Sequence, residues 1–600
     1  MRKELCVFKP VSVRPATFCE ATVAVPRRNS PVRPLHRLGG SRHNSVMTDL
    51  GNSTDPGATP PAAPRRDRGG ISPWVGRVLL VLSLVWMPAD TVRAADVTLS
   101  ERDLRRLGSG PLIAPDIAGL PADPALPVVD PRLTALAARQ LQGLVSRGIS
   151  AGFGGLLYEN RDRSHSILSR DMFPNLTFLT YDQDLIDAGL DYGLAGRILF
   201  PALVFGNSST ALTWGRQPRS QARLAMTMNG GAAAAYRDYR ANSIYIYPEH
   251  HDHDATDLFP ANWPYTIISQ GSSHSDMPFL QAVAMTLAAF PADTRTALEA
   301  AGLVAPTVQM ILRRNLTLVS SRAQYLSALA HPTVFQAEWL RPGRMIGQAA
   351  ALRPEDIPPV VRLRVLQEDF QTRAGLAQRD EHLFTTPSAI ARIWRGYDWQ
   401  RQMLISAEAT EDPNGRDLRF DWVLLRGDPE RVQIEPIGAR GARARITLRW
   451  HDPFVLPRRG PTDETVRDSS RVDIGVFVWN GRSDSAPAIV SVSFPTHQHR
   501  QYRAGRDGRM RLELIDYDAL GRGVAYDPVL HWSADWSDRF SWSDDGALLG
   551  WTRLHQGRRL NFDASGLLAD GTPMVHELAP LGDAPPELQF RRAEAAGQGG

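Results

Sequence analysis

Residues 243–254 read SIYIYPEHHDHD, a short apolar run that ends in a dense group of acidic and histidine side chains. The run has strand length, and its β-branched and aromatic residues favour a β-strand. The same pattern recurs upstream and downstream, in short apolar runs that end in Asn, Asp, Gly or Ser; these runs are 155–158, 176–181, 198–205, 243–247 and 265–269. This part of the chain is therefore predicted to form strands with polar loops at their ends.

Helical patterns flank these strands. Pro131 begins an amphipathic stretch with leucines at helical spacing, and Pro278 stands in the first turn of another. Further helices are predicted over 279–290, 294–301, 306–314, 322–330 and 387–395. Strands mixed with helices predict an α+β (or α/β) domain over 131–397.

After residue 397 the pattern is that of an all-β region. Strand-length runs occur at 403–407, 418–425, 431–437, 444–450, 472–479 and 488–494, with turn signals such as Asn480-Gly481 between them. This spacing predicts an immunoglobulin-like β-sandwich over 398–497. A β-hairpin meander is predicted over 498–582, and a disordered tail over 583–600.

Two stretches of the β region resemble known families. Residues 411–422, EDPNGRDLRFDW, resemble the D-x-N-G-D-x-L-x-(Y/F)-x-W signature of bacterial PKD-like and cadherin-like immunoglobulin-type domains. That resemblance implies a core role for Trp422 and an Asp-rich turn of the kind that sometimes binds calcium, although Arg416 departs from the pattern. Tyr517-Asp518 is similar to the repeated unit of YD-repeat proteins, with weaker copies at 502–509, 542–548 and 562–567. The general plan resembles that of uncharacterised secreted bacterial proteins, which implies no activity.

The charge of the chain is unevenly distributed. The whole chain carries +4, but residues 1–94 hold 14 Lys/Arg and 6 Asp/Glu, so residues 95–600 carry −4. A mildly acidic chain lacks the positive charge needed to hold a phosphate backbone, so no nucleic-acid partner is expected. Both cysteines, Cys6 and Cys19, lie at the start of the chain, which excludes disulfide and thiolate chemistry after residue 19.

The first 94 residues read as a leader. Residues 1–46 are predicted to be a mis-called or disordered leader, and 47–94 a linker and signal peptide with cleavage after Ala94. The apolar stretch of the signal, 78–87, is about half the length of a membrane span, so no stable span is expected after cleavage. Residues 95–130 are predicted to be an extended Pro-rich segment. The protein is expected to be secreted or periplasmic.

The densest polar cluster is a candidate metal site. Imidazole and carboxylate groups are the ligand set of zinc, manganese and iron sites, and alternate residues of a strand share a face. One divalent metal ion is a hypothesis here, although the spacing matches no known metal motif and a solvated loop explains the cluster as well. The candidate ligands are Glu249, His250, His251, Asp252, His253, Asp254 and Asp257.

Two further loops carry candidate catalytic residues. Ser272, His274 and Asp276 lie between a predicted strand and a helix, where free N–H groups could hold an oxyanion; a plain helix cap is the alternative. Ser208 lies in a strand–turn segment that partly matches a nucleophile elbow. Loop 158–165 resembles loop 247–254 in layout, so the two could converge on one pocket.

These features predict an exported hydrolase-like enzyme, with a polar loop site in the N-terminal domain and β modules that bind a polysaccharide or an envelope polymer. The alternative is a non-catalytic envelope or extracellular binding protein. An enzyme should gather five residues around one cavity, whereas a binding protein should scatter them; the five are His165, His251, His253, His274 and Asp276. The chain has no Walker loop and no G-x-G-x-x-G before a helix, so no nucleotide cofactor is expected.

Overall fold

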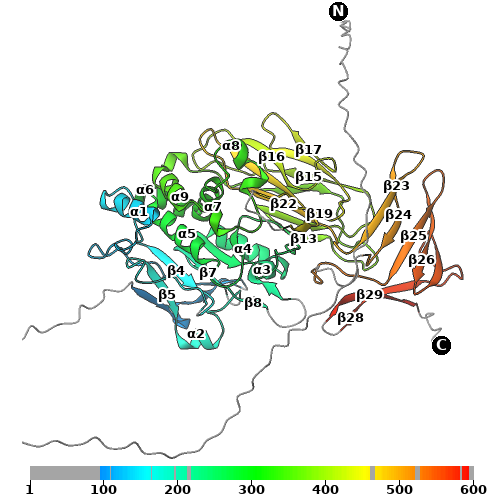
Figure 1. Ribbon diagram of the computed structural model, residues 1–600, viewed down its shortest axis with the longest axis horizontal. Coiled ribbons are helices and arrows are strands. Elements are labelled where there is room, and N and C mark those ends of the chain that lie inside the picture. The colour runs from blue at the N-terminus through cyan, green and yellow to red at the C-terminus, as the bar shows by residue number, and fades with distance from the viewer. Residues whose placement is uncertain are drawn as a thin grey trace, which may run out of the picture. The chain divides into compact units, whose positions relative to one another are not determined.

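The computed structural model describes residues 95–593, except 109, 164, 195–196, 213–217, 460–465, 520–526 and 582–583. The predicted leader and signal peptide, residues 1–94, lie outside the described residues. The described chain combines a mixed α/β region with several antiparallel sheets (Figure 1). This architecture confirms the predicted fold class.

A six-stranded parallel sheet forms the centre of the α/β region, in the order β1-β5-β4-β7-β10-β11. The strands are β1 (Asp96–Leu99), β4 (Leu156–Asn160), β5 (Thr177–Tyr181), β7 (Leu203–Asn207), β10 (Ser243–Pro248) and β11 (Thr266–Ser269). Their residues are mostly buried on both faces, as parallel sheets require. Setting the edge strand β1 aside, the order reverses between β4 and β7, which is the topological switch point of the sheet.

Helices pack on this sheet and on one another. α5 and α7 are the most buried, with ten buried residues of 13 and ten of 11. The helices are α1 (Leu136–Ser146), α2 (Gln183–Asp187), α3 (Gln221–Thr227), α4 (Gly231–Arg240), α5 (Met277–Ala289), α6 (Ala292–Ala301), α7 (Val304–Arg314), α8 (Arg322–Tyr325) and α9 (Pro342–Ala351). Short 3-10 turns are η1 (Glu101–Asp103), η2 (Ala328–Ala330), η3 (Ala337–Trp339) and η4 (Pro354–Asp356). None of the helices that the structure describes is long and apolar enough to cross a membrane.

The predicted sandwich is formed by two sheets. The inner sheet has the order β13-β14-β22-β21-β16 and the outer sheet β12-β15-β18-β17. The strands are β12 (Arg364–Glu368), β13 (His382–Thr386), β14 (Ala389–Ile393), β15 (Gln400–Ser406), β16 (Arg419–Arg426), β17 (Val432–Ile437), β18 (Arg443–Arg449), β21 (Arg471–Trp479) and β22 (Ala488–Ser493). Trp422 is 9% exposed and packs between the sheets, as predicted.

The predicted boundary at 397/398 is wrong. Strands β12, β13 and β14 belong to the sandwich, and the segment predicted as a helix over 387–395 contains β14. β14 pairs in parallel with β22, which lies a hundred residues later, so a tertiary contact decides its structure. The inner sheet also shares a core with the α/β region, through residues such as Leu425 and Phe477.

The C-terminal part is the predicted meander, followed by one hairpin. The meander has the order β23-β24-β25-β26-β27, and β28 pairs with β29. The bounds are β23 (His499–Ala504), β24 (Met510–Asp516), β25 (Trp536–Trp542), β26 (Leu548–His555), β27 (Arg558–Asp563), β28 (Met574–Leu581) and β29 (Ala584–Arg592). Because β29 is a strand, the prediction of a disordered tail from 583 is wrong over 584–592.

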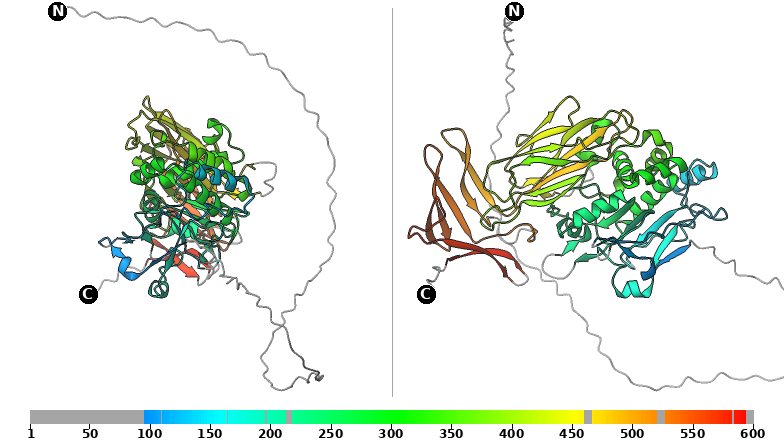
Figure 2. Two further views of the ribbon diagram at one scale, coloured as in Figure 1. Left: turned by 90° about the vertical axis from the view of Figure 1, so that its left-hand side faces the viewer. Right: turned by 180° about the vertical axis from the view of Figure 1, so that it is seen from behind.

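Small sheets complete the described chain, and two further views show the layers of helices and strands (Figure 2). One is β2-β3-β6, whose first strand follows β1 directly, so the segment 95–130 is less extended than predicted. The strands of all the small sheets are β2 (Arg105–Arg106), β3 (Leu112–Ile113), β6 (Ile198–Leu199), β8 (Ala211–Leu212), β9 (Arg219–Ser220), β19 (Phe454–Val455) and β20 (Asp468–Ser469).

Candidate functional site

The polar loops at the carboxyl ends of β4, β7 and β10 meet at the switch point. Ser209 donates two hydrogen bonds to the Asp162 carboxylate, from its backbone N–H at 3.0 Å and from its hydroxyl at 2.7 Å. His250 Nε2 donates to the Ser209 carbonyl at 2.6 Å. Loops 158–165 and 247–254 therefore both contact Ser209, in the loop that follows β7.

Asp276 lies in a buried network beside this point. Asn207 Nδ2 donates to Asp276 Oδ2 at 2.6 Å, and the Tyr158 hydroxyl donates to Asn207 Oδ1 at 2.8 Å. Burial raises the pKa of Asp276 more than the hydrogen bonds from Asn207 and Ser166 lower it. Asp276 is the residue that precedes α5, but its side chain makes no capping bond.

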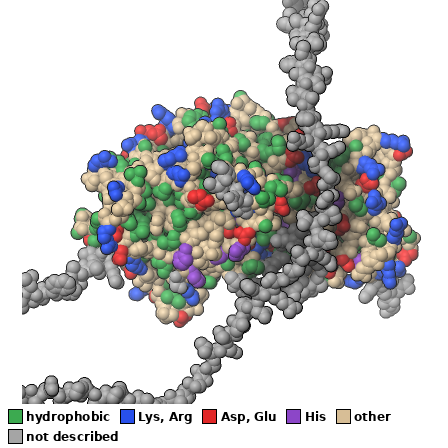
Figure 3. Space-filling model, viewed as in Figure 1, with side chains coloured by type: hydrophobic (Ala, Val, Ile, Leu, Met, Phe, Trp, Pro, Cys, Tyr) green, Lys and Arg blue, Asp and Glu red, His purple; other side chains and the backbone are tan. Residues whose placement is uncertain are grey.

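The other predicted catalytic residues do not form a catalytic group. The Ser208 hydroxyl donates to the Arg161 carbonyl at 3.0 Å and contacts Thr210, so it is used structurally. Ser272 and His274 are exposed, and the backbone of His274 is left-handed with φ 74°. Exposed histidine and acidic side chains lie near one another on the face in Figure 3.

The seven candidate metal ligands of loop 249–257 point to different partners. His251 pairs with Asp254 at the surface, Nδ1 to Oδ2, at 2.6 Å. Asp252 pairs with Arg223 at 2.9 Å and accepts the Ser220 N–H. Within the ranges that the structure describes, no three His, Cys, Asp or Glu side chains are grouped so as to hold a metal ion.

The predicted metal site is therefore wrong in its ligand geometry, because arginine side chains pair with carboxylates that were predicted to be metal ligands. Asp252 and Asp257, two of the carboxylates that a cation would bind, are already paired with guanidinium groups from other parts of the chain, and Asp254 pairs with His251. Glu249 is the exception, because it accepts N–H groups instead, from Gly271 at 3.0 Å, from His253 at 2.9 Å and from the Gln270 amide at 2.8 Å. Burial raises the pKa of Glu249 to about 7.

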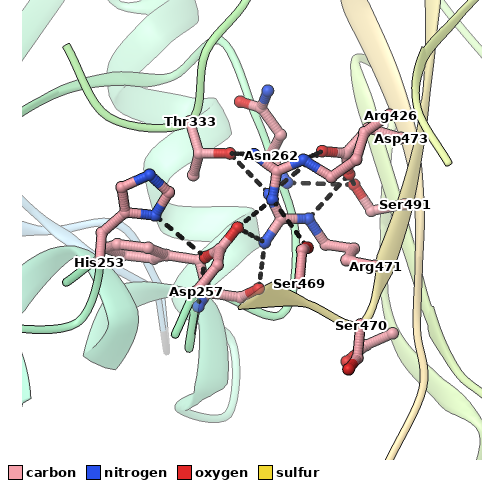
Figure 4. Close-up of polar contacts among 12 residues, drawn as sticks. His253, Asp257, Asn262, Thr333, Arg426, Ser469, Ser470, Arg471, Asp473 and Ser491 are labelled. Atoms are coloured by element: carbon pink, nitrogen blue, oxygen red, sulfur yellow. Dashed lines mark hydrogen bonds and ion pairs between the residues drawn. The ribbon is translucent and has the colours of Figure 1, made fainter. Parts of the chain in front are cut away.

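His253 and Asp257 form a pair at the end of the same loop. His253 Nδ1 lies 3.4 Å from Asp257 Oδ1, which is long for a hydrogen bond, and both side chains are buried (Figure 4). Catalytic hydrogen bonds are often long before substrate binds. Burial lowers the pKa of His253 more than Asp257 raises it, so the ring is neutral at neutral pH.

Asp257 is held by arginines of the inner sheet. Arg471 Nη1 lies 3.1 Å from Asp257 Oδ2, and Arg426 contacts the same oxygen. Although burial acts to raise it, these two guanidinium groups hold the pKa of Asp257 well below its usual range. Arg471 also forms two hydrogen bonds to Asp473, at 2.9 and 3.1 Å (Figure 4). Asp257 is therefore a permanent anion behind His253.

A cavity of about 580 Å³ opens beside His253, between the α/β region and the sandwich. This volume is within the usual range of small-molecule sites, which often lie between two structural layers. The wall combines apolar side chains, such as Trp339 and Leu424, with the guanidinium groups of Arg426 and Arg467. The cavity can therefore accept an apolar body together with a polar or charged group.

The two ring nitrogens of His253 differ in their surroundings. Nδ1 is fully enclosed next to Asp257. Nε2 is not among the enclosed atoms, has no hydrogen-bond partner in the described ranges, and belongs to a residue that lines the cavity. The Asp-facing nitrogen of His253 is therefore inside the protein, while the residue itself lines the cavity.

Of the five residues expected around one cavity, His253 alone lines this one, so the five are scattered, which is the arrangement expected of a non-catalytic binding protein. His165, His251 and His274 are exposed, and Asp276 is buried at the switch point. The acidic partner is Asp257, which the sequence analysis had assigned to a metal. The role of Arg426, Arg467 and Arg471 was not predicted from the sequence. The available signal was a charged pair, Arg471 and Asp473, within the largely apolar run 471–479.

Comparison with known proteins identifies no family. Neither the family models nor the curated proteins contain a match. Among solved structures, a nucleoside hydrolase-related hypothetical protein from Saccharophagus degradans, described as associated with carbohydrate metabolism, is 10% identical and covers 56% of this chain and 78% of its own, with a TM-score of 0.19. The endo-fucoidan hydrolase MfFcnA9, from glycoside hydrolase family 107, is 9% identical and covers 83% and 97%, with a TM-score of 0.15. Scores this low carry no argument about this chain.

Proposed function

We propose that the chain is a hydrolase-like enzyme in which the His253–Asp257 pair is the general base. The observation that carries the proposal is the position of His253, a residue that lines a cavity and whose Nδ1 lies against an anionic carboxylate. This is the arrangement by which an acidic residue fixes the tautomer of a catalytic imidazole. It supports catalysis better than the exposed histidines of the same loop do.

In the proposed reaction, His253 Nε2 removes a proton from a water molecule in the cavity. The resulting hydroxide attacks an electrophilic atom of the substrate, and the imidazolium then returns the proton to the leaving group. Asp257 stabilises the imidazolium that forms in between. The guanidinium groups in the wall stabilise negative charge that develops on the substrate.

The backbone of His253 is fixed from two sides, which supports a positioned base. Glu249 accepts its N–H at 2.9 Å, and Arg467 Nε donates to its carbonyl at 2.8 Å. A base held in this way needs no rearrangement before it reacts, and positioning of this kind accounts for much of enzymatic rate acceleration.

A screen of chromogenic acyl, phosphoryl and glycosyl substrates tests the proposal. His253→Gln should lower kcat on any substrate found by about 10²–10⁴-fold, the usual contribution of a general base. The matched control is His251→Gln, because His251 lies two residues away and its ring is exposed. Equal activity of both variants would refute the role of His253. No hydrolysis of any substrate class would favour the alternative, a non-catalytic envelope or extracellular binding protein.

We also propose that the chain is exported and that its β region is a distant relative of PKD-like and YD-repeat proteins. β1 begins at Asp96, so cleavage after Ala94 leaves the edge strand of the parallel sheet intact. The core position of Trp422 agrees with what the PKD-like resemblance implies. N-terminal sequencing of exported protein is expected to give Ala95 as the first residue; a membrane-bound chain that keeps residues 47–94 would contradict this.

A further inference from the structure

The outer sheet of the sandwich carries a polar groove of about 440 Å³ on its exposed face. Three residues in register across adjacent strands form its centre: Gln402 of β15 is opposite Thr447 of β18, and Thr447 is opposite Gln433 of β17. Gln402 and Gln433 are exposed, whereas Thr447 is 8% exposed. Thr447 therefore forms a floor between two long amide side chains.

The groove has hydrogen-bonding groups that the protein does not use. Gln367, Gln400 and Gln402 also line it, and in the described ranges their amide groups make no side-chain hydrogen bond. The Thr447 hydroxyl likewise has no described partner and is not among the fully enclosed atoms. Each amide offers N–H donors and a carbonyl acceptor, and the hydroxyl offers both.

The charge and apolar content of the groove narrow the choice of ligand. Its one arginine, Arg445, lies 3.8 Å from Glu435, so the positive charge is offset and a phosphate backbone has no cationic partner. Asp369 Oδ2 accepts the backbone N–H of Gln402 at 2.8 Å. Only Met403 and Leu404 are apolar among the lining residues, too few for a lipid or an amphipathic helix.

We propose that this groove binds a neutral polysaccharide chain. Sugar hydroxyls are donors and acceptors at once, which complements the amide and hydroxyl groups here. An open groove across four strands admits a polymer rather than only its end. The site is separate from the His253 cavity, because the two share no lining residue.

Affinity electrophoresis of residues 95–600 in gels that contain dextran, xylan or galactomannan tests this proposal. At least one of these neutral polymers should retard the protein, whereas anionic alginate and DNA should not. Gln402→Ala combined with Gln433→Ala should weaken the retarding interaction at least tenfold, and Thr447→Val should weaken it to a smaller extent. The matched control is Gln371→Ala with Gln501→Ala, two exposed glutamines outside the groove.

The outcomes separate the alternatives. No retardation by any neutral polymer, or equal retardation of the groove variant and the control, would overturn the proposal. Retardation by alginate or DNA alone would assign the face to a different partner. The substituted glutamines are exposed, so their replacement should leave the melting temperature unchanged. An unchanged melting temperature would exclude misfolding as the cause of weaker retardation. His253→Gln should be retarded like the unmodified protein, so this result and the hydrolase assay can fail independently.

Discussion

Asp257→Asn is expected to be among the most destabilising single changes in the chain. The side chain is fully enclosed and lies between Arg471, whose side chain is 2% exposed, and Arg426, at 11%. Asparagine keeps the shape but removes the negative charge. Two buried guanidinium groups would then share one carboxylate, that of Asp473, and one positive charge would be left without compensation.

The expected cost follows from breaking a buried ion pair on one side, which is about 3–5 kcal/mol. That is a large part of the 5–15 kcal/mol that usually separates folded from unfolded states. Asp254→Asn is the matched control, because Asp254 lies three residues earlier in the same loop and pairs only with the exposed His251. An exposed pair contributes about 1 kcal/mol or less.

Urea denaturation at pH 7.5, followed by tryptophan fluorescence, measures both variants against the unmodified chain. The free energy of unfolding should fall by about 3–5 kcal/mol for Asp257→Asn and by about 1 kcal/mol or less for Asp254→Asn. Equal values for the two variants would refute the claim that Asp257 is the charge partner of the buried arginines. Asp257→Asn should also lower the pKa of His253 further, because it removes the group that raises it.

Two further measurements test the core and the electrostatics. Trp422→Ala should lower the free energy of unfolding by about 3–5 kcal/mol, because it removes a ring packed between the sheets and the hydrogen bond from its Nε1 to the Gly441 carbonyl. Trp542→Ala, at a 37% exposed site, should lower it by about 1 kcal/mol or less. A similar loss for both variants would contradict the core assignment. Burial raises the pKa of Glu249 from 4.5 to about 7, so the folded chain holds this proton more tightly than the unfolded chain does, and the associated stability is present below pH 4.5 and lost as the pH rises through 7. This loss amounts to about 3 kcal/mol at most, and Glu249→Gln should flatten the fall in unfolding free energy between pH 5 and 8; an unchanged pH profile would refute it.

The strands of the fold could be predicted because their signals are local. The run 243–247 became β10 and the run 472–479 became β21, each within a residue or two. Ile390 and its neighbours show where local signals fail. A stretch of five residues with four apolar side chains fits a helix turn or a strand equally well, and pairing with β22 decided for the strand.

The segment 584–592 failed for a different reason. Its sequence, APPELQFRR, contains two consecutive prolines, which cannot donate to a sheet. It is nonetheless a strand, because β29 pairs with β28 and its two prolines fall at the register shift opposite Ala579 and Leu581, where ladder hydrogen bonds are interrupted. A proline signal marks an edge strand as readily as a loop, and the sequence alone does not distinguish the two.

The position of the candidate site in the chain could be predicted, but the pairing of its side chains could not. Loop 249–257 does contain the residues of interest, because a group of histidines and carboxylates at a strand end is visible in the sequence. Which of these side chains pair is decided by Arg426 and Arg471, more than 160 residues later. No local pattern connects Asp257 to them, so a metal was the natural way to account for clustered negative charge.

The same arginines join the sandwich to the α/β region. Arg426 and Arg471 lie on the inner sheet, but the carboxylate of Asp257 that they share comes from the α/β region. An isolated sandwich would keep both guanidinium groups and only Asp473 to offset them, at a face that also carries Phe477 of the shared core. The contact that holds the two regions together is therefore the contact that orients His253. A cavity lined from both sides has its proposed catalytic geometry only when both are folded.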